Sequence, residues 1–312
     1  MGLCPSKDMA IGLVIFNPAQ SKKLIDNYYE MIQQFDKYKL PFFTLELVYD
    51  DRRPEIPEAF HIPGKSVLFQ KENLCRILET LIPRKFTKLA FLDADILFDD
   101  QDWYWKLSKA LDSYDVIQPF ETCYWLDEEK KISLDRETVL KIKGPDWDFR
   151  YHPGFAWGFR RSWYKKVGFF DYAVSGSGDT LSVIKWLNKT IPKNFHSLPG
   201  PLIKKYSSFC LQKDKPKISY LPGTLRHLFH GRRENRKYVD RHKILNLQED
   251  ITDLLYKNSE GLFEWNSENQ DLSDKLKEYF ISRNDDNLSL SELKNNESYF
   301  ALPDLPNLIV TS

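Results

Sequence analysis

Two carboxylates one residue apart, Asp93 and Asp95, carry the clearest chemical signal in the sequence. An apolar run over residues 89–92 leads into them, and a second run over residues 96–98 follows. Buried strands of α/β proteins are nearly continuous apolar runs, and ligands of these folds bind beyond the carboxyl ends of the strands. Two carboxylates there repel each other unless a cation lies between them, and Mg²⁺ or Mn²⁺ is held in this way together with substrate phosphates. We therefore expect a metal–diphosphate site at a strand end; the alternative is a pair of solvated loop or cap residues.

A second candidate lies in the glycine-containing stretch that leads to Asp179. The small residues Gly154 and Gly158 would let a ligand approach the backbone. Asp179 ends the loop 175–179 and is predicted to stand at the start of a helix, where a carboxylate is stabilised as the anion and can act as a general base. The alternative is a carboxylate that only caps the helix after a glycine turn.

A third candidate is the run of histidines and arginines over residues 226–241. His227 and His230 are three residues apart, so they can share one side of a helix or line one loop, and histidine is a common ligand of transition metals. The arginines of the run could bind phosphate oxygens. A basic surface face is the alternative.

These candidates need a scaffold, and the alternation of apolar strands with helical patterns predicts one. It is typical of an α/β fold with a mainly parallel sheet and helices on both faces. After residue 245 the chain changes to an amphipathic helix and a polar tail, with Leu272, Leu276, Tyr279 and Phe280 on one helix face. The predicted strands cover residues 10–16, 41–49, 66–70, 89–92, 115–120 and 217–220, the predicted helices cover residues 21–35, 71–81, 102–111, 161–167 and 179–186, and a proline-rich loop covers residues 54–64.

The composition excludes several classes of protein. Lys plus Arg and Asp plus Glu each number 45 in 312 residues, so the net charge is zero, and a dedicated nucleic-acid binder would carry a basic excess. The apolar fraction of 42% is too high for a disordered chain. The four cysteines are far apart and form no CxxC pair, which argues against a zinc or redox site and for reduced thiols.

The same features predict a cytoplasmic protein. No apolar run approaches the length of a transmembrane helix, and the N-terminus lacks the apolar region of a secretory signal. Reduced thiols fit a cytosolic compartment. The first six residues match a loose N-myristoylation pattern, so Gly2 and Cys4 are candidates for a weak lipid anchor.

The three candidate segments together resemble the GT-A glycosyltransferases. Residues 92–95 are similar to the DxD motif of that superfamily. Residues 154–171 and 176–179 are similar to the glycine-rich acceptor segment and the acidic loop of galactosyl- and N-acetylgalactosaminyltransferases, and residues 227–230 to the segment that supplies a third metal ligand. The resemblance covers about residues 10–245, and the sequence of these segments is most similar to a group from bacteria and large DNA viruses.

The resemblance implies a role for each matched residue. Asp93 would face the ribose and the metal, Asp95 would ligate the metal, and His227 would be the third ligand. His230 would lie nearer the phosphates, and Asp179 would be the base in an inverting reaction. The loop departs from the family at Gly178, where a glutamate is usual, so Asp179 is the only carboxylate of the loop. The other residues implied to contact the nucleotide sugar are Asn17, Glu46, Asn73 and Trp157.

The expected protein is therefore a metal-dependent glycosyltransferase with a GT-A catalytic domain over residues 1–245 and a helical C-terminal extension and tail over residues 246–312. It would use Mn²⁺ or Mg²⁺ to move a hexosyl or deoxyhexosyl group from a UDP-sugar to a hydroxyl of a glycan or glycoconjugate, with inversion. If it retains configuration, Asp179 only orients the acceptor. A catalytically silent sugar- or nucleotide-binding protein on the same fold and a nucleotidyltransferase are the alternatives.

Overall fold

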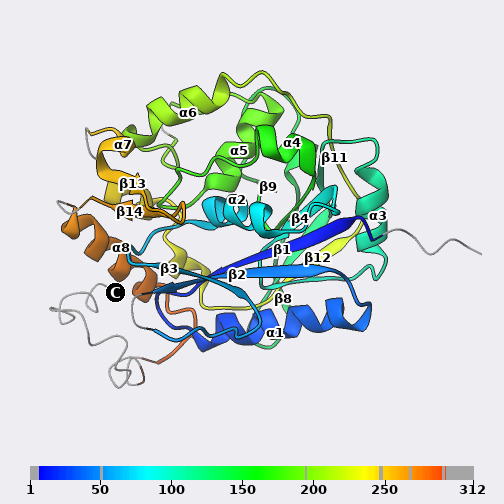
Figure 1. Ribbon diagram of the computed structural model, residues 1–312, viewed down its shortest axis with the longest axis horizontal. Coiled ribbons are helices and arrows are strands. Elements are labelled where there is room, and N and C mark those ends of the chain that lie inside the picture. The colour runs from blue at the N-terminus through cyan, green and yellow to red at the C-terminus, as the bar shows by residue number, and fades with distance from the viewer. Residues whose placement is uncertain are drawn as a thin grey trace, which may run out of the picture.

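A seven-stranded sheet forms the centre of the molecule (Figure 1). The computed structural model describes residues 7–49, 52–193, 195–245, 249–266, 269–289 and 292. Strands pair in parallel along the sheet except β10, which is antiparallel to both of its neighbours. In spatial order the strands are β11 (Ile218–Tyr220), β6 (Val116–Gln118), β10 (Ala156–Arg160), β4 (Lys88–Leu92), β1 (Met9–Phe16), β2 (Phe42–Tyr49) and β3 (Phe60–Gly64).

Helices cover both faces of this sheet, because the side chains of each central strand alternate between two hydrophobic clusters. In β1, Ile11 and Leu13 belong to the cluster under α1 and α3, whereas Ala10 and Val14 belong to the cluster under α2 and α5. The mainly parallel α/β fold predicted from the sequence is thus confirmed. The helices before residue 245 are α1 (Lys22–Lys37), α2 (Lys71–Leu81), α3 (Trp103–Ala110), α4 (Arg161–Lys166), α5 (Gly178–Leu187) and α6 (Ile203–Cys210), with 3-10 turns at Val139–Lys141, Gly200–Leu202, Arg233–Arg236 and Asp240–Leu245.

One predicted strand is wrong. Residues 66–70 form no strand, and the chain instead pairs β3 with β2 inside the predicted proline-rich loop. Pro63 lies within β3 and cannot donate to a sheet ladder, but β3 is the edge strand, where proline is tolerated. The proline that predicted a loop therefore marks the edge of the sheet.

A second sheet of five strands lies beside the carboxyl end of β4. Its β5 begins directly after Asp95, and its β12 ends at His227, which pairs with Ile96 in the antiparallel ladder. This pairing brings two distant parts of the sequence together at the predicted metal site. The strands in spatial order are β5 (Ile96–Phe98), β12 (Thr224–His227), β7 (Thr122–Leu126), β8 (Ile132–Thr138) and β9 (Tyr151–His152).

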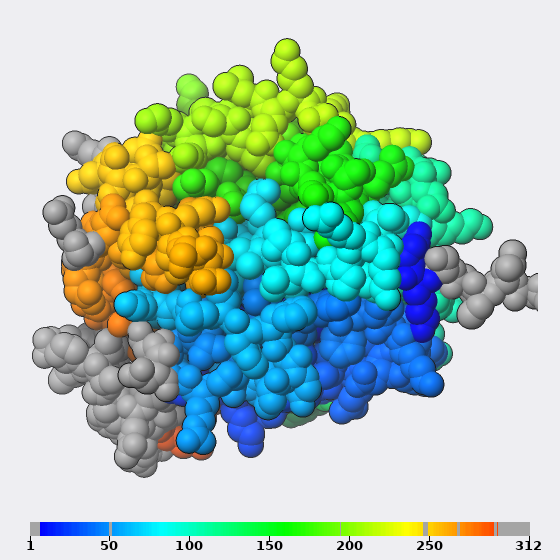
Figure 2. Space-filling view, in the orientation of Figure 1, coloured from blue at the N-terminus to red at the C-terminus, as the bar shows by residue number. Residues whose placement is uncertain are grey.

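The C-terminal part contains a β-hairpin as well as helices. After α7 (Ile251–Leu254) come β13 (Leu255–Lys257), β14 (Phe263–Trp265) and α8 (Gln270–Ser282). The predicted apolar face of α8 is buried, and Phe280 stacks on Phe69 with ring centres 5.0 Å apart. In Figure 2 the orange surface of this part continues into the cyan surface of the N-terminal half. Both sides of the predicted boundary at residue 245 contribute to one hydrophobic cluster.

Two expectations fall on other parts of the chain. Gly2 and Cys4, the candidates for a lipid anchor, and the tail from residue 293 lie outside the described residues. Among the helices of the described part, none is long and apolar enough to cross a membrane.

Candidate functional site

Asp93 and Asp95 lie directly after the carboxyl end of β4. β4 ends at Leu92, and the backbone N–H of Asp93 donates to the carbonyl of Phe155 at 2.7 Å. The carbonyl of Asp95 accepts from the N–H of Leu228 at 2.8 Å. The segment between β4 and β5 is therefore hydrogen-bonded to the residue before β10 and to the residue after β12, as expected for a site at a strand end.

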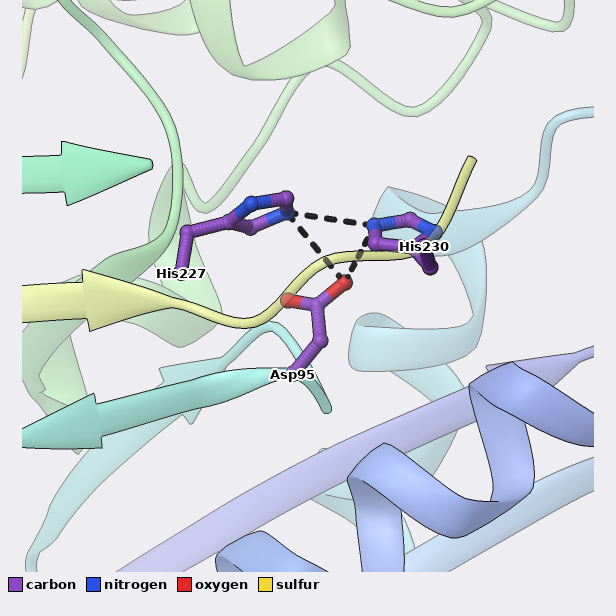
Figure 3. Close-up of side chains that lie close together, drawn as sticks. All are labelled: Asp95, His227 and His230. Carbon is purple, nitrogen blue, oxygen red and sulfur yellow. Dashed lines mark hydrogen bonds and ion pairs between the residues drawn. The ribbon is translucent and has the colours of Figure 1, made fainter. Parts of the chain in front are cut away.

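Asp95, His227 and His230 converge on one point (Figure 3). Oδ2 of Asp95 lies 2.8 Å from Nε2 of His230 and 3.5 Å from Nε2 of His227, and the two nitrogens are 3.1 Å apart. Neighbouring ligands of an octahedral cation with bonds of about 2.1 Å are separated by roughly 3 Å. Two imidazoles and one carboxylate on one side of a divalent transition metal leave positions open for a substrate. The residues present thus fit a manganese-like ion.

The protonation states of these groups also fit a cation. Burial alone would raise the pKa of Asp95, but His227 and His230 outweigh it and hold that pKa well below its usual range. Burial lowers the pKa of His227, against the opposing effect of Asp95. An ionised carboxylate and a neutral imidazole are the forms that bind metals. Oδ1 of Asp95 is buried without a hydrogen-bond partner among the described residues, which a cation or its bound water would relieve.

Asp93 lies apart from this group and pairs with Lys71, the first residue of α2. Its Oδ1 is 3.1 Å from Nζ of Lys71, which is also 3.7 Å from Oδ2 of Asp179. Burial would lower the pKa of Lys71, but Asp93 and Asp179 raise it well above its usual value, so the ammonium stays charged. Burial and Asp95 raise the pKa of Asp93 to about 6 in spite of Lys71. The structure therefore groups His230, and not Asp93, with the two other predicted metal ligands.

A small cavity of about 20 Å³ lies next to Asp95, His227 and His230, because Phe155 lines it and the Phe155 ring centre is 4.8 Å from that of His227. Asp179 and Glu72 line it together with Asp93, and its other walls are apolar side chains and the segment 154–157 that includes Trp157. Three carboxylates around one ammonium leave an excess of negative charge in this cavity. We name it the carboxylate cavity; its lining residues are Val14, Lys71, Glu72, Cys75, Phe91, Leu92, Asp93, Gly154, Phe155, Ala156, Trp157, Phe169 and Asp179.

Asp179 is held in a fixed orientation inside α5. The N-cap of α5 is Ser177, which has a φ of 69°, so Asp179 is the second helical residue and not the cap that the plainer alternative required. Its Oδ1 accepts from the N–H of Thr180 at 2.6 Å. Burial would raise the pKa of Asp179, but Lys71 and His152 lower it below the usual value, so this carboxylate is ionised.

Two glycines leave room for the carboxylates. A Cβ at Gly154 would lie 2.6 Å from Oδ2 of Asp179, and a Cβ at Gly178 would lie 2.5 Å from the carboxyl carbon of Glu72. The space that a side chain at position 178 would occupy is therefore filled by a carboxylate from α2. Gly178 stands where the family usually has a glutamate, and Glu72 supplies a carboxylate there from a different element.

Glu72 is a residue that sequence analysis missed. Glu72 is 4% exposed, and no other described residue donates a hydrogen bond to its carboxylate. Burial raises its pKa to about 7, with Lys71 opposing and Asp179 adding to the shift. His152 was missed as well; its Nε2 has no partner among the described residues, and burial lowers its pKa to about 3. The only signal in the sequence for Glu72 is its place in a charged pair with Lys71 at the start of α2, and no local signal marks His152.

The other residues predicted to contact the nucleotide sugar make hydrogen bonds within the protein. Asn17 donates to the carboxylate of Glu55 at 3.1 Å. Glu46 accepts from the N–H groups of residues 55 and 56 at 2.7 and 3.0 Å. Asn73 donates to the carbonyl of Gly261 at 3.0 Å, which ties α2 to the C-terminal hairpin. Trp157 is 2% exposed, and its Nε1 donates to the carbonyl of Pro153 at 2.8 Å.

Comparison with known proteins gives remote structural likenesses only. No family model and no curated protein matches the sequence. The catalytic domain of Drosophila β1,4-galactosyltransferase 7 in complex with xylobiose is 10% identical with a TM-score of 0.42, over 85% of this chain and 98% of that one. A variant of it in complex with manganese, UDP-Gal and xylobiose is 11% identical with a TM-score of 0.43, over 85% and 98%. Glucosyl-3-phosphoglycerate synthase from Mycobacterium tuberculosis is 10% identical with a TM-score of 0.37, over 75% and 79%. Likenesses this remote assign no activity to this chain.

Proposed function

We propose that the protein is a metal-dependent glycosyltransferase that moves a hexosyl or deoxyhexosyl group from a UDP-sugar to a hydroxyl of a glycan or glycoconjugate. The observation that carries the proposal is a juxtaposition. An anionic carboxylate and two histidines stand at metal-ligand spacing, directly beside a cavity that holds a second, ionised carboxylate, Asp179. A cation site suits a departing diphosphate, and a separate carboxylate suits an acceptor hydroxyl.

On the donor side, Asp95, His227 and His230 would hold Mn²⁺ or Mg²⁺. When bound, such a cation acts as a Lewis acid that neutralises the leaving diphosphate. Asp93 and Lys71 line the carboxylate cavity, where they would hydrogen-bond the transferred sugar or the phosphate next to it. His230 is in contact with the other two ligand residues, so we place it at the metal and not only at the phosphates.

On the acceptor side, Asp179 would take the proton. Its Oδ1 is held by Thr180, so Oδ2, which lies beside Gly154 and 3.7 Å from the ammonium of Lys71, is the oxygen that would take the proton. As the acceptor oxygen bonds to the anomeric carbon, the bond to the diphosphate breaks and the hydroxyl proton passes to Oδ2. This single displacement inverts the configuration. Glu72, which lines the same cavity, would accept a hydrogen bond from a second hydroxyl of the acceptor.

Calorimetry of UDP binding with and without Mn²⁺ tests the proposal. A cation shared by the protein and the diphosphate makes the two ligands bind cooperatively, so UDP should bind more tightly when Mn²⁺ is present. Asp95→Ala should abolish this cooperativity. Independent binding of the two ligands to the unaltered protein would contradict the shared site. NMR of the products formed from UDP-galactose and UDP-glucose then distinguishes sugar transfer or hydrolysis from nucleotidyl transfer and from silent binding.

A further inference from the structure

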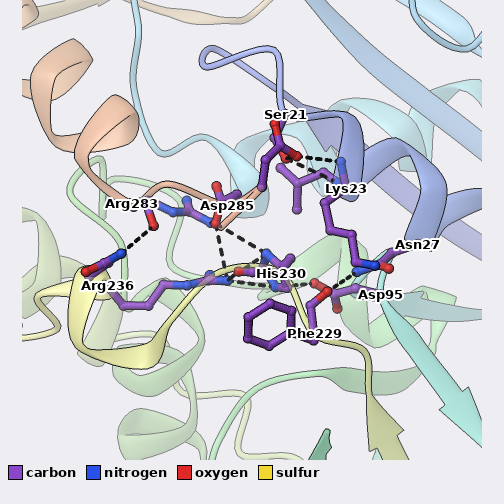
Figure 4. Close-up of polar contacts among 12 residues, drawn as sticks. Ser21, Lys23, Asn27, Asp95, Phe229, His230, Arg236, Arg283 and Asp285 are labelled. Atoms are coloured by element: carbon purple, nitrogen blue, oxygen red, sulfur yellow. Dashed lines mark hydrogen bonds and ion pairs between the residues drawn. The ribbon is translucent and has the colours of Figure 1, made fainter. Parts of the chain in front are cut away.

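The segment that follows α8, residues 283–286, lies against the metal triad (Figure 4). Gly231 has a φ of 76°, and a Cβ there would lie 2.6 Å from the carbonyl oxygen of Asn284. The turn after His230 is therefore packed directly against this segment. Within it, Asp285 is 3% exposed and Arg283 is 6% exposed. A buried charged pair next to three metal-ligating side chains calls for a physical explanation.

Asp285 reaches the outer side of His230. Its Oδ1 lies 3.4 Å from Nδ1 of His230, while Nε2 of the same ring faces Asp95 at 2.8 Å. The same oxygen is 3.2 Å from Nη2 of Arg283 and 3.4 Å from Nη2 of Arg236. Nη2 of Arg236 also lies 2.6 Å from Nδ1, 2.8 Å from Nε2 and 2.8 Å from the carbonyl oxygen of His230. Asp285 is thus the carboxylate that balances two arginines beside a ligand histidine.

The neighbouring Asp286 points to a different element. Its Oδ1 accepts from Oγ of Ser21 and from the N–H of Lys23, both at 2.7 Å, at the N-terminus of α1. Asn27 of the same helix donates to the carbonyl of Phe229 at 3.0 Å, so α1 in turn contacts the loop that holds His230. Two adjacent carboxylates of one segment therefore serve different contacts, the first at the triad and the second at a helix end.

We propose that Asp285 is a positioning residue of the metal site, which holds His230 with Nε2 directed at Asp95 and at the cation. The C-terminal segment is then a component of the catalytic unit. The inference rests on the metal site of the proposed function. Ligand histidines commonly have a carboxylate or carbonyl at the second ring nitrogen, and loss of such a partner weakens metal binding by roughly 10- to 100-fold. Loss of Asp285 would also leave the charges of Arg236 and Arg283 unbalanced near a bound cation.

The test is a titration of the full chain with Mn²⁺ alone, with free Mn²⁺ followed by electron paramagnetic resonance. Asp285→Asn should bind Mn²⁺ roughly 10- to 100-fold more weakly than the unaltered protein. Asp286→Asn is the matched control: it should bind Mn²⁺ with unchanged affinity and melt at a lower temperature, because α1 loses charge at its N-terminus. A merely structural role of Asp285 would lower the melting temperature and leave the Mn²⁺ affinity in place.

Mn²⁺ affinity of Asp285→Asn within twofold of the unaltered protein would overturn the inference. If this variant does not fold, Asp285→Glu carries the test, because it keeps the charge but shifts the carboxylate by one methylene. Weaker Mn²⁺ binding by a folded Asp285→Glu supports the positioning role, and unchanged binding overturns it. If the unaltered protein binds no Mn²⁺, the metal site of the proposed function fails, and that outcome is distinct from equal binding by the variants.

Discussion

Asp93 and Asp95 leave the same strand one residue apart, yet they lie in two different environments. Asp95 faces two histidines, which hold its pKa well below the usual range against the effect of burial. Asp93 faces Lys71 and the carboxylate cavity, and burial raises its pKa to about 6. In the proposed function, a single Asp-Ala-Asp turn would separate a carboxylate that binds the cation from one that faces the ammonium of Lys71 and the carboxylate cavity. Neighbouring elements set the chemistry of each carboxylate, as when one enzyme uses two carboxylates in two roles.

The largest effect should come from the acceptor side of the proposed site. In Asp179→Asn, transfer should fall by roughly 10²- to 10⁴-fold, the usual contribution of a positioned acid–base group. Joint binding of UDP and Mn²⁺ should stay unchanged, because Asp179 lies outside the triad. Turnover and product configuration by NMR of the anomeric proton check both parts. Retention of configuration would remove Asp179 as the base, even with the metal site intact.

The next effect should separate the two carboxylates of the turn. Asp95→Ala should weaken Mn²⁺ binding by more than roughly 100-fold, since loss of a ligand exceeds loss of a supporting contact. Asp93→Ala should weaken it by less than about 10-fold, because Asp93 pairs with Lys71. Calorimetry with Mn²⁺ on both variants measures the contrast. Equal losses would mean that both carboxylates ligate the ion, and that the division of the site is wrong.

A smaller effect should come from Glu72. Glu72→Gln keeps the shape but removes the charge that would accept a hydrogen bond from the acceptor, so transfer should fall by roughly 10- to 100-fold. Affinity for UDP with Mn²⁺ should not change. Steady-state kinetics with varied acceptor concentration and calorimetry with UDP give the two measurements. Normal transfer by this variant would reduce Glu72 to a packing residue of α2.

The smallest effect concerns stability in the absence of metal. Burial raises the pKa of Glu72 from an ordinary 4.5 to about 7, so the folded protein holds this proton more tightly than the unfolded chain. The resulting stabilisation is complete below pH 4.5 and is lost as the pH rises through 7. As the pH rises from 5 to 8, the melting temperature of Glu72→Gln should therefore fall by roughly 2 °C less than that of the unaltered protein. The exposed Glu129→Gln is the control and should match the unaltered protein. Identical pH profiles for all three proteins would show that Glu72 does not titrate in this way.

The sequence predicted the parts of the fold and site that local pattern determines. Continuous apolar runs identified β1, β2 and β4, because these strands are buried on both faces. The abrupt end of one such run placed Asp93 and Asp95 at a sheet edge. The resemblance implied His227 as a metal ligand and His230 nearer the phosphates, and only the fold shows that their ring nitrogens are 3.1 Å apart.

Long-range contacts determined the rest and left no local pattern. Glu72 enters the site because Gly178, from a distant helix, leaves room for it. Most of β8 is exposed or half-buried, so no apolar alternation marked the second sheet. The resemblance implied nucleotide-sugar contacts for Asn17, Glu46 and Asn73, but their polar groups bind neighbouring loops and the C-terminal hairpin. Asp285 lies in a polar stretch that resembles a linker in the sequence, and only the packing of α8 against the rest of the protein brings it beside His230.

The register between β5 and β12 also bears on how the protein folds. The ladder sets His227 opposite Ile96, and a slip of one residue would turn the imidazole to the other side of the sheet. Pairings between segments so far apart in the chain form slowly, because a long loop must close first. The proposed cation would bind only after this step, so it would stabilise the finished ladder by mass action and contribute nothing to the earlier collapse. Metal uptake during refolding would then mark the moment at which the two halves of the chain have joined.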